Sequence, residues 1–203
     1  NVEQRLAIHT SASNSLSLII GGAGVGKTTV LKALYKIYDE AKIHIFQVAL
    51  AGRAAKRMTE ATGRPALTIA SFIKTIKEND LSDICVIVID EASMVDIITM
   101  YRLCEMLPQH IRILLVGDTG QLMPVGPGLV LHALAKVADI PKVELKVVKR
   151  YGGEIALAAQ SVREGIWPEL SNETTSNIAF LPCSWSDIAQ QVVSLYAEDI
   201  ENT

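Results

Sequence analysis

Short apolar runs alternate with helical patterns along most of the chain. The runs are rich in β-branched residues and predict strands at 16–20, 44–50, 84–89 and 111–116. Between the runs, apolar residues recur at intervals of three and four, which predicts helices at 28–38, about 53–61 and about 97–107. The run 84–89 is apolar throughout, as expected for a strand that is buried on both faces of a sheet.

This alternation of strands and helices predicts an α/β fold with a central parallel sheet, because parallel strands need crossover connections. Open parallel sheets bind ligands beyond the carboxyl ends of their strands. Three of the predicted strands lead directly into Gly21, Asp90 and Gly117–Asp118. We therefore expect the functional groups to gather at one edge of the sheet.

The pattern weakens beyond residue 126. A strand at 143–148, a short helix around 155–162 and a polar loop at 171–177 precede a helical pattern that begins near residue 188. We expect one compact domain over residues 1–170. The polar loop and the C-terminal helix follow it over residues 171–203.

Composition and charge narrow the class of protein. The 203 residues are 49% hydrophobic and carry a net charge of −3, so any binding of nucleic acid needs a local basic surface. No apolar stretch is long enough to cross a bilayer, so we expect no membrane association. The three cysteines lack metal-ligand spacing, and Cys85 and Cys104 fit small core positions, which predicts a cytoplasmic protein. Because Asn1 stands in place of Met, we expect a piece of a longer protein.

The segment Gly21–Thr28 matches the P-loop pattern G-x-x-x-x-G-K-[ST] at every fixed position. Its glycines let successive backbone N–H groups point at phosphate oxygens, and the following helix adds its positive dipole end. We expect Lys27 to reach the β- and γ-phosphates of ATP. A glycine-rich turn could match by chance, but this one lies between a predicted strand and a predicted helix. The predicted nucleotide-binding residues are Gly22, Ala23, Gly24, Val25, Gly26, Lys27, Thr28 and Thr29.

Asp90 and Glu91 follow the buried run 84–89, as in a Walker B element. A carboxylate at this strand end can hold Mg²⁺, so Asp90 and the Thr28 hydroxyl are the predicted metal ligands. Glu91 is the predicted general base that deprotonates the attacking water. The alternative is that the two acids simply begin the next helix, where negative charge is favourable.

The string Gly117–Gly128 reads G-D-T-G-Q-L-M-P-V-G-P-G and follows the next predicted strand. An ordinary turn could account for Gly117–Gly120 but not for the whole string. Downstream of a P-loop and of D-E-A-S-M-V, the string resembles motif III of superfamily 1 DNA helicases. Among these it is most similar to the RecD-like, 5′-to-3′ branch (the exodeoxyribonuclease V alpha-subunit type). The resemblance runs from Asn1 to about Pro168 and implies the N-terminal RecA-like motor domain, a P-loop NTPase with a three-layer fold around a parallel sheet.

The resemblance also implies roles for three further side chains. Gln121 is the motif III glutamine that links the γ-phosphate to the DNA-binding surface. Arg150, after the next predicted strand, contacts the γ-phosphate, and Gln4, ahead of the first strand, reads the adenine of ATP. The predicted catalytic residues are therefore Lys27, Glu91, Gln121 and Arg150.

Single-stranded DNA is the expected partner. The segment 52–57 resembles the family's motif Ia, and its cations at i, i+3 and i+4 share one helix face that could bind phosphates. The segment 68–72 resembles the next DNA-contact segment. The predicted DNA-binding residues are Gly52, Arg53, Lys56, Arg57 and Thr68. A solvated basic face without a ligand is the alternative for the individual side chains.

Together these features predict an ATP-driven helicase motor domain that translocates on single-stranded DNA. The rival is a degenerate, non-catalytic nucleotide- or DNA-binding helicase module in a conjugative relaxase or repair protein. This rival is considered because the DNA-contact segments differ from the family pattern. For example, this sequence has Ala49-Leu50-Ala51 where many relatives have A-P-T. An unrelated P-loop enzyme, such as a nucleotide kinase, would leave Gly117–Gly128 unexplained.

A second RecA-like domain is the other expected partner, because superfamily 1 motors complete the ATP site with an arginine from that domain. Such an arginine is worth about 10³–10⁵ in rate. The motifs of a second motor domain do not occur after Arg150. We therefore expect this chain to bind ATP but to hydrolyse it slowly. Repair or conjugation subunits are further candidate partners.

Overall fold

The computed structural model describes residues 1–77, 80–81, 84–147, 154–172 and 178–201. The chain divides into two compact units, Asn1–Arg150 and Tyr151–Thr203. This division lies before the boundary predicted at residue 170, so residues 151–170 belong to the second unit. All predicted functional residues lie in the first unit.

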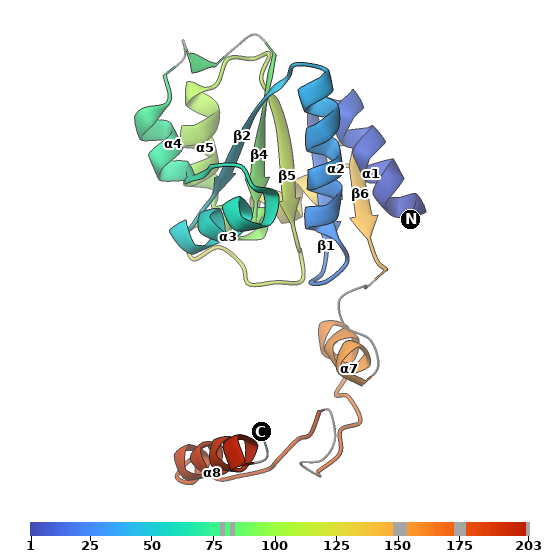
Figure 1. The fold of residues 1–203 in the computed structure, drawn as a ribbon, viewed down its shortest axis with the longest axis vertical. Coiled ribbons are helices and arrows are strands. Elements are labelled where there is room, and N and C mark those ends of the chain that lie inside the picture. Colours follow the sequence, from blue (N-terminus) through green and yellow to red (C-terminus); the bar gives the residue numbers. More distant parts are fainter. Residues whose placement is uncertain (78–79, 82–83, 148–153, 173–177, 202–203) are drawn as a thin grey trace. The chain divides into compact units, whose positions relative to one another are not determined.

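A six-stranded sheet, parallel throughout, forms the centre of the first unit (Figure 1). The strand order is β3-β2-β4-β5-β1-β6. Since β4, β5 and β1 are neighbours, their carboxyl ends lie together at one edge, as predicted. The strands are β1 (Leu16–Gly21), β2 (His44–Ala49), β3 (Ala66–Thr68), β4 (Cys85–Asp90), β5 (Arg112–Gly117) and β6 (Lys142–Leu145).

Helices cover both faces of the sheet and make a three-layer fold (Figure 1). One face packs against α1 (Val2–Ser13), α2 (Lys27–Glu40) and α3 (Gly52–Thr62). The other packs against α4 (Ile69–Thr75), α5 (Ile97–Met106) and α6 (Val130–Lys136).

Strand β4 shows why the central strands are apolar at every position. Val86 and Val88 pack into the core beneath α1 and α2, whereas Cys85, Ile87 and Ile89 pack into the core beneath α4 and α5. Side chains alternate between the two faces, and both faces are covered. The predicted burial on both faces is therefore confirmed.

Helix α1 is an element that the apolar pattern does not predict. Its buried residues are Gln4, Ala7 and Ser11, which lie at helical spacing but are small or polar. Helix α4 and strand β3 are short, at seven and three residues, and also escape detection. Periodicity in apolar residues identifies helices with an apolar face, and α1 has little of one, whereas α4 and β3 are too short for a period to stand out.

The predicted burial of Cys104 is wrong. Cys104 is exposed, and Leu103 is the residue of α5 that is fully buried. Apolar residues occur nearly all round α5, so their spacing alone cannot select the buried face. Packing selects it, because Leu103 lies in the core cluster that also holds Ile69 and Phe72 of α4.

The second unit contains α7 (Glu154–Arg163) and α8 (Ile188–Glu201), close to the predicted helices. Among its described side chains, Ala158 and Pro168 are buried and the others are partly or fully exposed. In the described part of the chain, no helix combines the length and the apolar character needed to cross a membrane.

Candidate functional site

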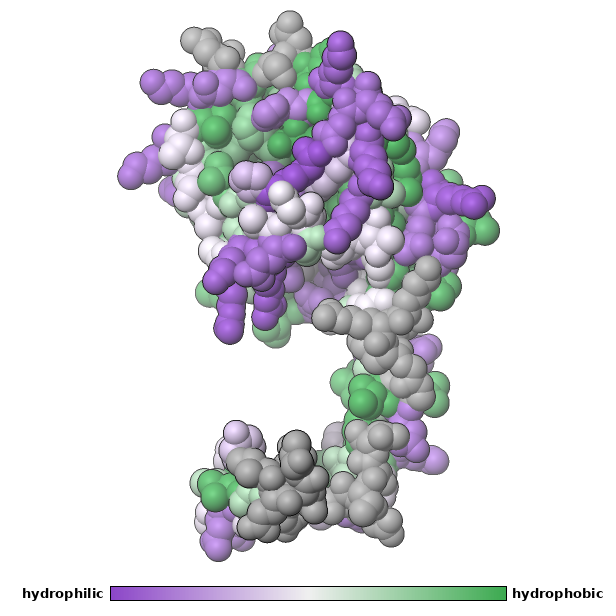
Figure 2. All heavy atoms as spheres, viewed as in Figure 1, coloured by the Kyte–Doolittle hydropathy of each residue, from purple (hydrophilic) through white to green (hydrophobic). Residues whose placement is uncertain are grey.

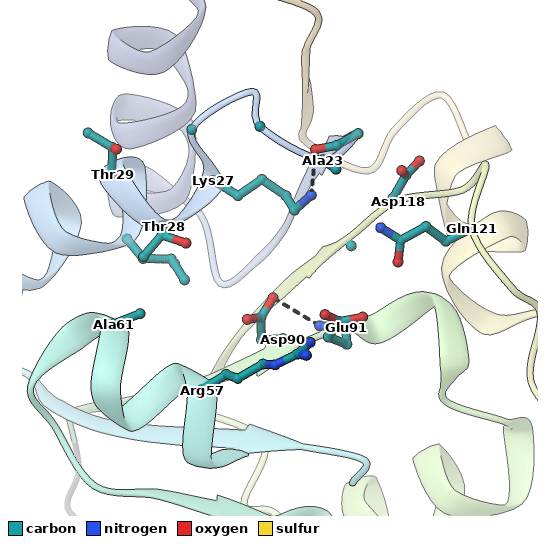
Figure 3. A pocket seen from close by; sticks show the side chains of 15 residues that line it. Ala23, Lys27, Thr28, Thr29, Arg57, Ala61, Asp90, Glu91, Asp118 and Gln121 are labelled. Carbon is teal, nitrogen blue, oxygen red and sulfur yellow. Dashed lines mark hydrogen bonds between the residues drawn. The ribbon is translucent and has the colours of Figure 1, made fainter. Parts of the chain in front are cut away.

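The segment between β1 and α2 has the backbone of a phosphate-binding loop. Gly24 and Gly26 have φ angles of 76° and 91°, a region that glycine adopts without strain. Helix α2 begins at Lys27, which places its N-terminal N–H groups at the loop. The Lys27 ammonium donates to the carbonyls of Gly21 and Gly22 at 2.6 and 2.8 Å, so it lies within the loop (Figure 3).

Helix α1 holds Gln4 against this loop. Gln4 is buried, and a Cβ atom at Gly26 would lie only 2.5 Å from its Nε2. Asn1 caps the helix, since its side chain accepts a hydrogen bond from the Gln4 backbone N–H at 2.8 Å. The fold therefore brings Gln4 to the P-loop, although its contact with adenine stays a prediction.

Asp90 ends β4, and Glu91 begins a tight turn ahead of the short 3₁₀ helix η2 (Ala92–Met94). Glu91 has φ 54° and ψ 36°, an unusual conformation for a residue other than glycine. Its backbone N–H donates to Asp90 Oδ1 at 2.9 Å. Burial raises the pKa of the Asp90 carboxyl above its ordinary value, and the Glu91 N–H and Lys27 oppose that shift. A bound cation would offset this burial of charge.

The next α-helix does not need these two acids at its start. Asp96 caps α5, and its Oδ1 accepts a hydrogen bond from the Thr99 N–H at 2.6 Å. Asp90 belongs to the strand, and Glu91 belongs to the turn after it. The arrangement favours the Walker B interpretation over the helix-start alternative.

The loop after β5 carries the third group of polar residues. Asp118 is buried, and its Oδ1 accepts a hydrogen bond from the Gly120 N–H at 2.9 Å. His132 of α6 lies with Nε2 3.0 Å from the Thr119 carbonyl and can donate to it. These contacts fix the part of the loop directly before Gln121, which lines the cavity (Figure 3).

The three strand ends enclose one cavity of about 690 Å³ (Figure 3). It brings together the P-loop, both carboxylates of the Walker B pair and the motif III glutamine. The predicted residues that line it are Gly22, Ala23, Gly24, Gly26, Lys27, Thr28, Thr29, Asp90, Glu91 and Gln121. Val25 is instead buried in the core beneath α1 and α2, so its side chain supports the loop from behind. The predicted Arg150 lies outside the described residues.

Sequence reasoning did not assign Asp118 a role, yet it lines this cavity. Its position directly after β5 could have identified it, because the residues that follow β1 and β4 also line the cavity. A second omission is Arg57, which also lines the cavity although its sequence motif suggested a DNA contact.

The predicted DNA-binding residues lie on α3 and at the start of α4. Figure 2 shows long hydrophilic side chains over the position of α3, and Arg53, Lys56 and Arg57 are its exposed cations. Thr68 is the N-cap of α4: its Oγ1 accepts from the Ser71 N–H at 3.0 Å and donates to Ser71 Oγ at 2.8 Å. Contact of these residues with DNA stays a prediction.

Comparison with known proteins agrees with this geometry. The family model of the AAA domain matches residues 1–177. The chain belongs to this AAA domain family. The chain is 34% identical over 174 residues to the ATP-dependent RecD2 DNA helicase of Deinococcus radiodurans, a match that covers 82% of the chain and 24% of that protein. It is 31% identical over 170 residues to the RecBCD enzyme subunit RecD of Haemophilus influenzae, covering 68% of the chain and 27% of the subunit.

The AAA domain thus spans about a quarter of the length of these two relatives. Among solved structures, Pif1 helicase from Candida albicans matches with a TM-score of 0.62 at 23% identity, over 83% of the chain and 45% of the Pif1 chain. This match confirms the predicted P-loop NTPase fold. The two relatives confirm the resemblance to RecD-like helicases.

Proposed function

We propose that this chain is the ATP-binding and ATP-hydrolysing motor domain of a DNA helicase that translocates on single-stranded DNA. The observation that carries the proposal is the cavity in which Lys27, Glu91 and Gln121 meet. The similarity to RecD-type helicases supports it. A degenerate, non-catalytic module is not favoured, because the relatives are helicases by name and these three side chains line one cavity.

Mg²⁺ fits the donor groups at one end of the cavity. Thr28 offers an exposed hydroxyl, and Asp90 offers a largely buried carboxylate. Both are oxygen ligands of the kind that Mg²⁺ prefers. Among the residues that the structure describes, no group of three or more His, Cys, Asp or Glu side chains could hold a metal. The ion would therefore be shared with ATP phosphates, whose charge it neutralises when bound.

The side chains support in-line attack of water on the γ-phosphorus. The water oxygen forms the new P–O bond, the bond to the β–γ bridging oxygen breaks, and ADP leaves. Glu91 accepts a proton from the attacking water. Lys27 neutralises charge on the β- and γ-phosphates, and Gln121 hydrogen-bonds the γ-phosphate. Because Gln121 lies in the loop after β5, that loop can respond to loss of the phosphate.

Single-stranded DNA is the proposed partner, with Arg53, Lys56, the Gly52 backbone and Thr68 as its contacts. Phosphate contacts by surface cations make binding depend on salt. The relatives' names include a subunit of the RecBCD enzyme, and we extend such an assembly to this chain only as a proposal. A second RecA-like domain that supplies the remaining arginine, and a cytoplasmic location, stay predictions as well.

Nucleotide binding to the purified chain tests the first half of the proposal. A fluorescent ATP analogue should bind only with Mg²⁺ present, and Lys27→Ala should weaken binding by about tenfold to a hundredfold, since charged hydrogen bonds contribute ~1.5–3 kcal/mol. Lys36→Ala is the matched control, because it removes an equal charge from an exposed position of the same helix, away from the cavity. It should leave the affinity unchanged.

Stimulation of ATPase activity by single-stranded DNA in the full-length parent tests the second half. A motor should be stimulated, and its DNA affinity should fall as salt rises. ATP binding without any stimulation would support the non-catalytic module instead. In the 203-residue chain alone, hydrolysis as fast as that of an intact helicase would contradict the expectation of slow turnover.

A further inference from the structure

Arg57 occupies a position that its sequence motif does not predict. It lies on α3, the helix that resembles a DNA-contact motif, yet it lines the cavity of the P-loop (Figure 3). It also lines an adjoining cavity of about 540 Å³ between α2 and α3. Figure 3 shows its side chain extending from α3 toward Asp90 and Glu91. Arg57 is thus a cation on the wall of the site that faces the P-loop.

The neighbours of Arg57 identify which end of the site it serves. Thr28, Asp90 and Glu91 line both cavities with it. In the proposed mechanism, Thr28 and Asp90 bind Mg²⁺, and Glu91 accepts a proton from the attacking water. Gln4, which the resemblance assigns to adenine, lies at the other side of the P-loop, against Gly26. Arg57 is therefore placed at the γ-phosphate end of the site.

The cavity holds few cations that could bind the negative charge of a γ-phosphate. Three carboxylates, those of Asp90, Glu91 and Asp118, line the cavity against two cations, Lys27 and Arg57. The Lys27 ammonium is held by two loop carbonyls. A guanidinium can bind two phosphate oxygens at once, through paired N–H donors.

We propose that Arg57 binds the γ-phosphate of ATP, opposite Lys27, rather than a phosphate of DNA; this inference rests on the proposed ATP site. Lys56, the adjacent cation, points in a different direction from Arg57, because consecutive helical residues are about 100° apart around the helix axis. Lys56 is exposed, lies 4.0 Å from Glu60 and does not line either cavity. Helix α3 therefore presents one cation to the nucleotide and another to solvent, which would make it a direct link between the ATP site and the proposed DNA surface.

The test compares ATP with ADP, because only ATP carries the γ-phosphate. Arg57→Ala should weaken binding of a non-hydrolysable fluorescent ATP analogue by about tenfold to a hundredfold. Binding of the matching ADP analogue should change by less than about twofold, since the β-phosphate interactions remain. Arg57→Lys should restore part of the loss, because it keeps the charge but not the fork of donors.

Controls separate this inference from the function on which it rests. Lys36→Ala should leave both nucleotides and thermal unfolding unchanged, and the exposed Arg57 variants should unfold like the wild type. Equal weakening of ATP and ADP would overturn the γ-phosphate role. Unchanged nucleotide binding with a loss of affinity for a single-stranded oligonucleotide would overturn it in favour of the DNA contact. If the unmodified chain bound neither nucleotide, the ATP-site proposal itself would fail.

Discussion

The two carboxylates at the end of β4 differ in their backbone setting, because Asp90 belongs to the strand and Glu91 to the turn after it. Asp90 is largely buried, and burial raises its pKa. Glu91 occupies the left-handed region, which turns the chain sharply after the strand. The turn lets adjacent residues of the sequence both line one cavity. In the proposed mechanism, the strand-end carboxylate binds the metal and the carboxylate of the turn acts as the base.

Glu91→Gln should separate binding from hydrolysis. The amide is similar in size but cannot accept the proton of the attacking water, so the ATPase rate should fall by about 10²–10⁴. The affinity for ATP should change little, because Glu91 does not hold the phosphates in this mechanism. Single-turnover hydrolysis and equilibrium binding measure the two quantities. A rate within a few-fold of the wild type would mean that another group serves as the base.

Asp90→Asn should stabilise the protein in the absence of Mg²⁺ and nucleotide. Burial raises the pKa of Asp90 above its unfolded-state value. Ionisation of this carboxyl therefore lowers the stability of the folded protein as pH rises through the folded pKa. The asparagine Oδ1 can still accept from the Glu91 N–H. We expect Tm to rise by roughly 2–4 °C near pH 8, the shift for about 1 kcal/mol in a domain of this size.

The same variant should lose Mg²⁺-dependent nucleotide binding, and its advantage in Tm should shrink as pH falls toward about 4. Calorimetry at a series of pH values measures how the difference in Tm between the variant and the wild type changes with pH. A lower Tm at pH 8 would show that the buried charge is compensated in the folded protein.

At the scale of elements, the end of β5 is packed against both neighbours of the site. A Cβ atom at Gly117 would lie 2.6 Å from Leu131 Cδ2 in α6 and 3.1 Å from the backbone nitrogen of Ser93 in η2. The glycine therefore lets η2, the element that follows Glu91, approach the strand. The edge of the sheet is held together by close backbone packing as well as by the motif residues.

Gly117→Ala should damage catalysis more than nucleotide binding. The methyl group must displace η2 or α6, which we expect to lower stability by about 1–3 kcal/mol, the usual range for overpacking. The shift would move Glu91 from the attacking water, while the P-loop is anchored separately by β1 and α2. Denaturant unfolding measures the loss of stability. Comparison of the change in kcat with the change in KM measures the loss of catalysis relative to nucleotide binding. Gly165→Ala, at a φ of 76° and with open space around it, is a control for backbone strain at a residue that does not line the cavity.

At the scale of the whole molecule, the two units differ in how much core they have. Both hydrophobic cores lie in the first unit. In the described part of the second unit, the buried residues are Ala158 and Pro168. Trp167 and Trp185, the two tryptophans of the chain, also lie in the second unit.

The second unit should therefore unfold at a lower denaturant concentration than the first, because it buries little apolar surface. Tryptophan fluorescence reports the second unit, and far-UV circular dichroism is dominated by the larger first unit. We expect the fluorescence transition to precede the dichroism transition. An ATP analogue with Mg²⁺ should raise only the midpoint followed by dichroism. Coincident transitions that shift together would show that the units unfold as one.

The sequence alone determined the chemistry of the strand ends and the order of the central elements. The P-loop, Asp90–Glu91 and Gln121 were predictable because each follows an apolar run whose length and composition mark a buried strand. The parallel order followed from the alternation with helices. Such features depend on residues that are close in the chain, so local pattern is enough to find them.

Only the tertiary structure decided which side chains share the site and which faces are buried. The strand order brings Gly21, Asp90 and Gly117 to one edge, although they are far apart in sequence. The fold places Arg57 at the cavity of the P-loop, and packing of Leu103 into the core leaves Cys104 exposed. A helix with cations or apolar residues on several sides has more than one face that could bind a ligand or pack into the core. The choice between them is made by contacts with distant parts of the chain, which no local pattern records.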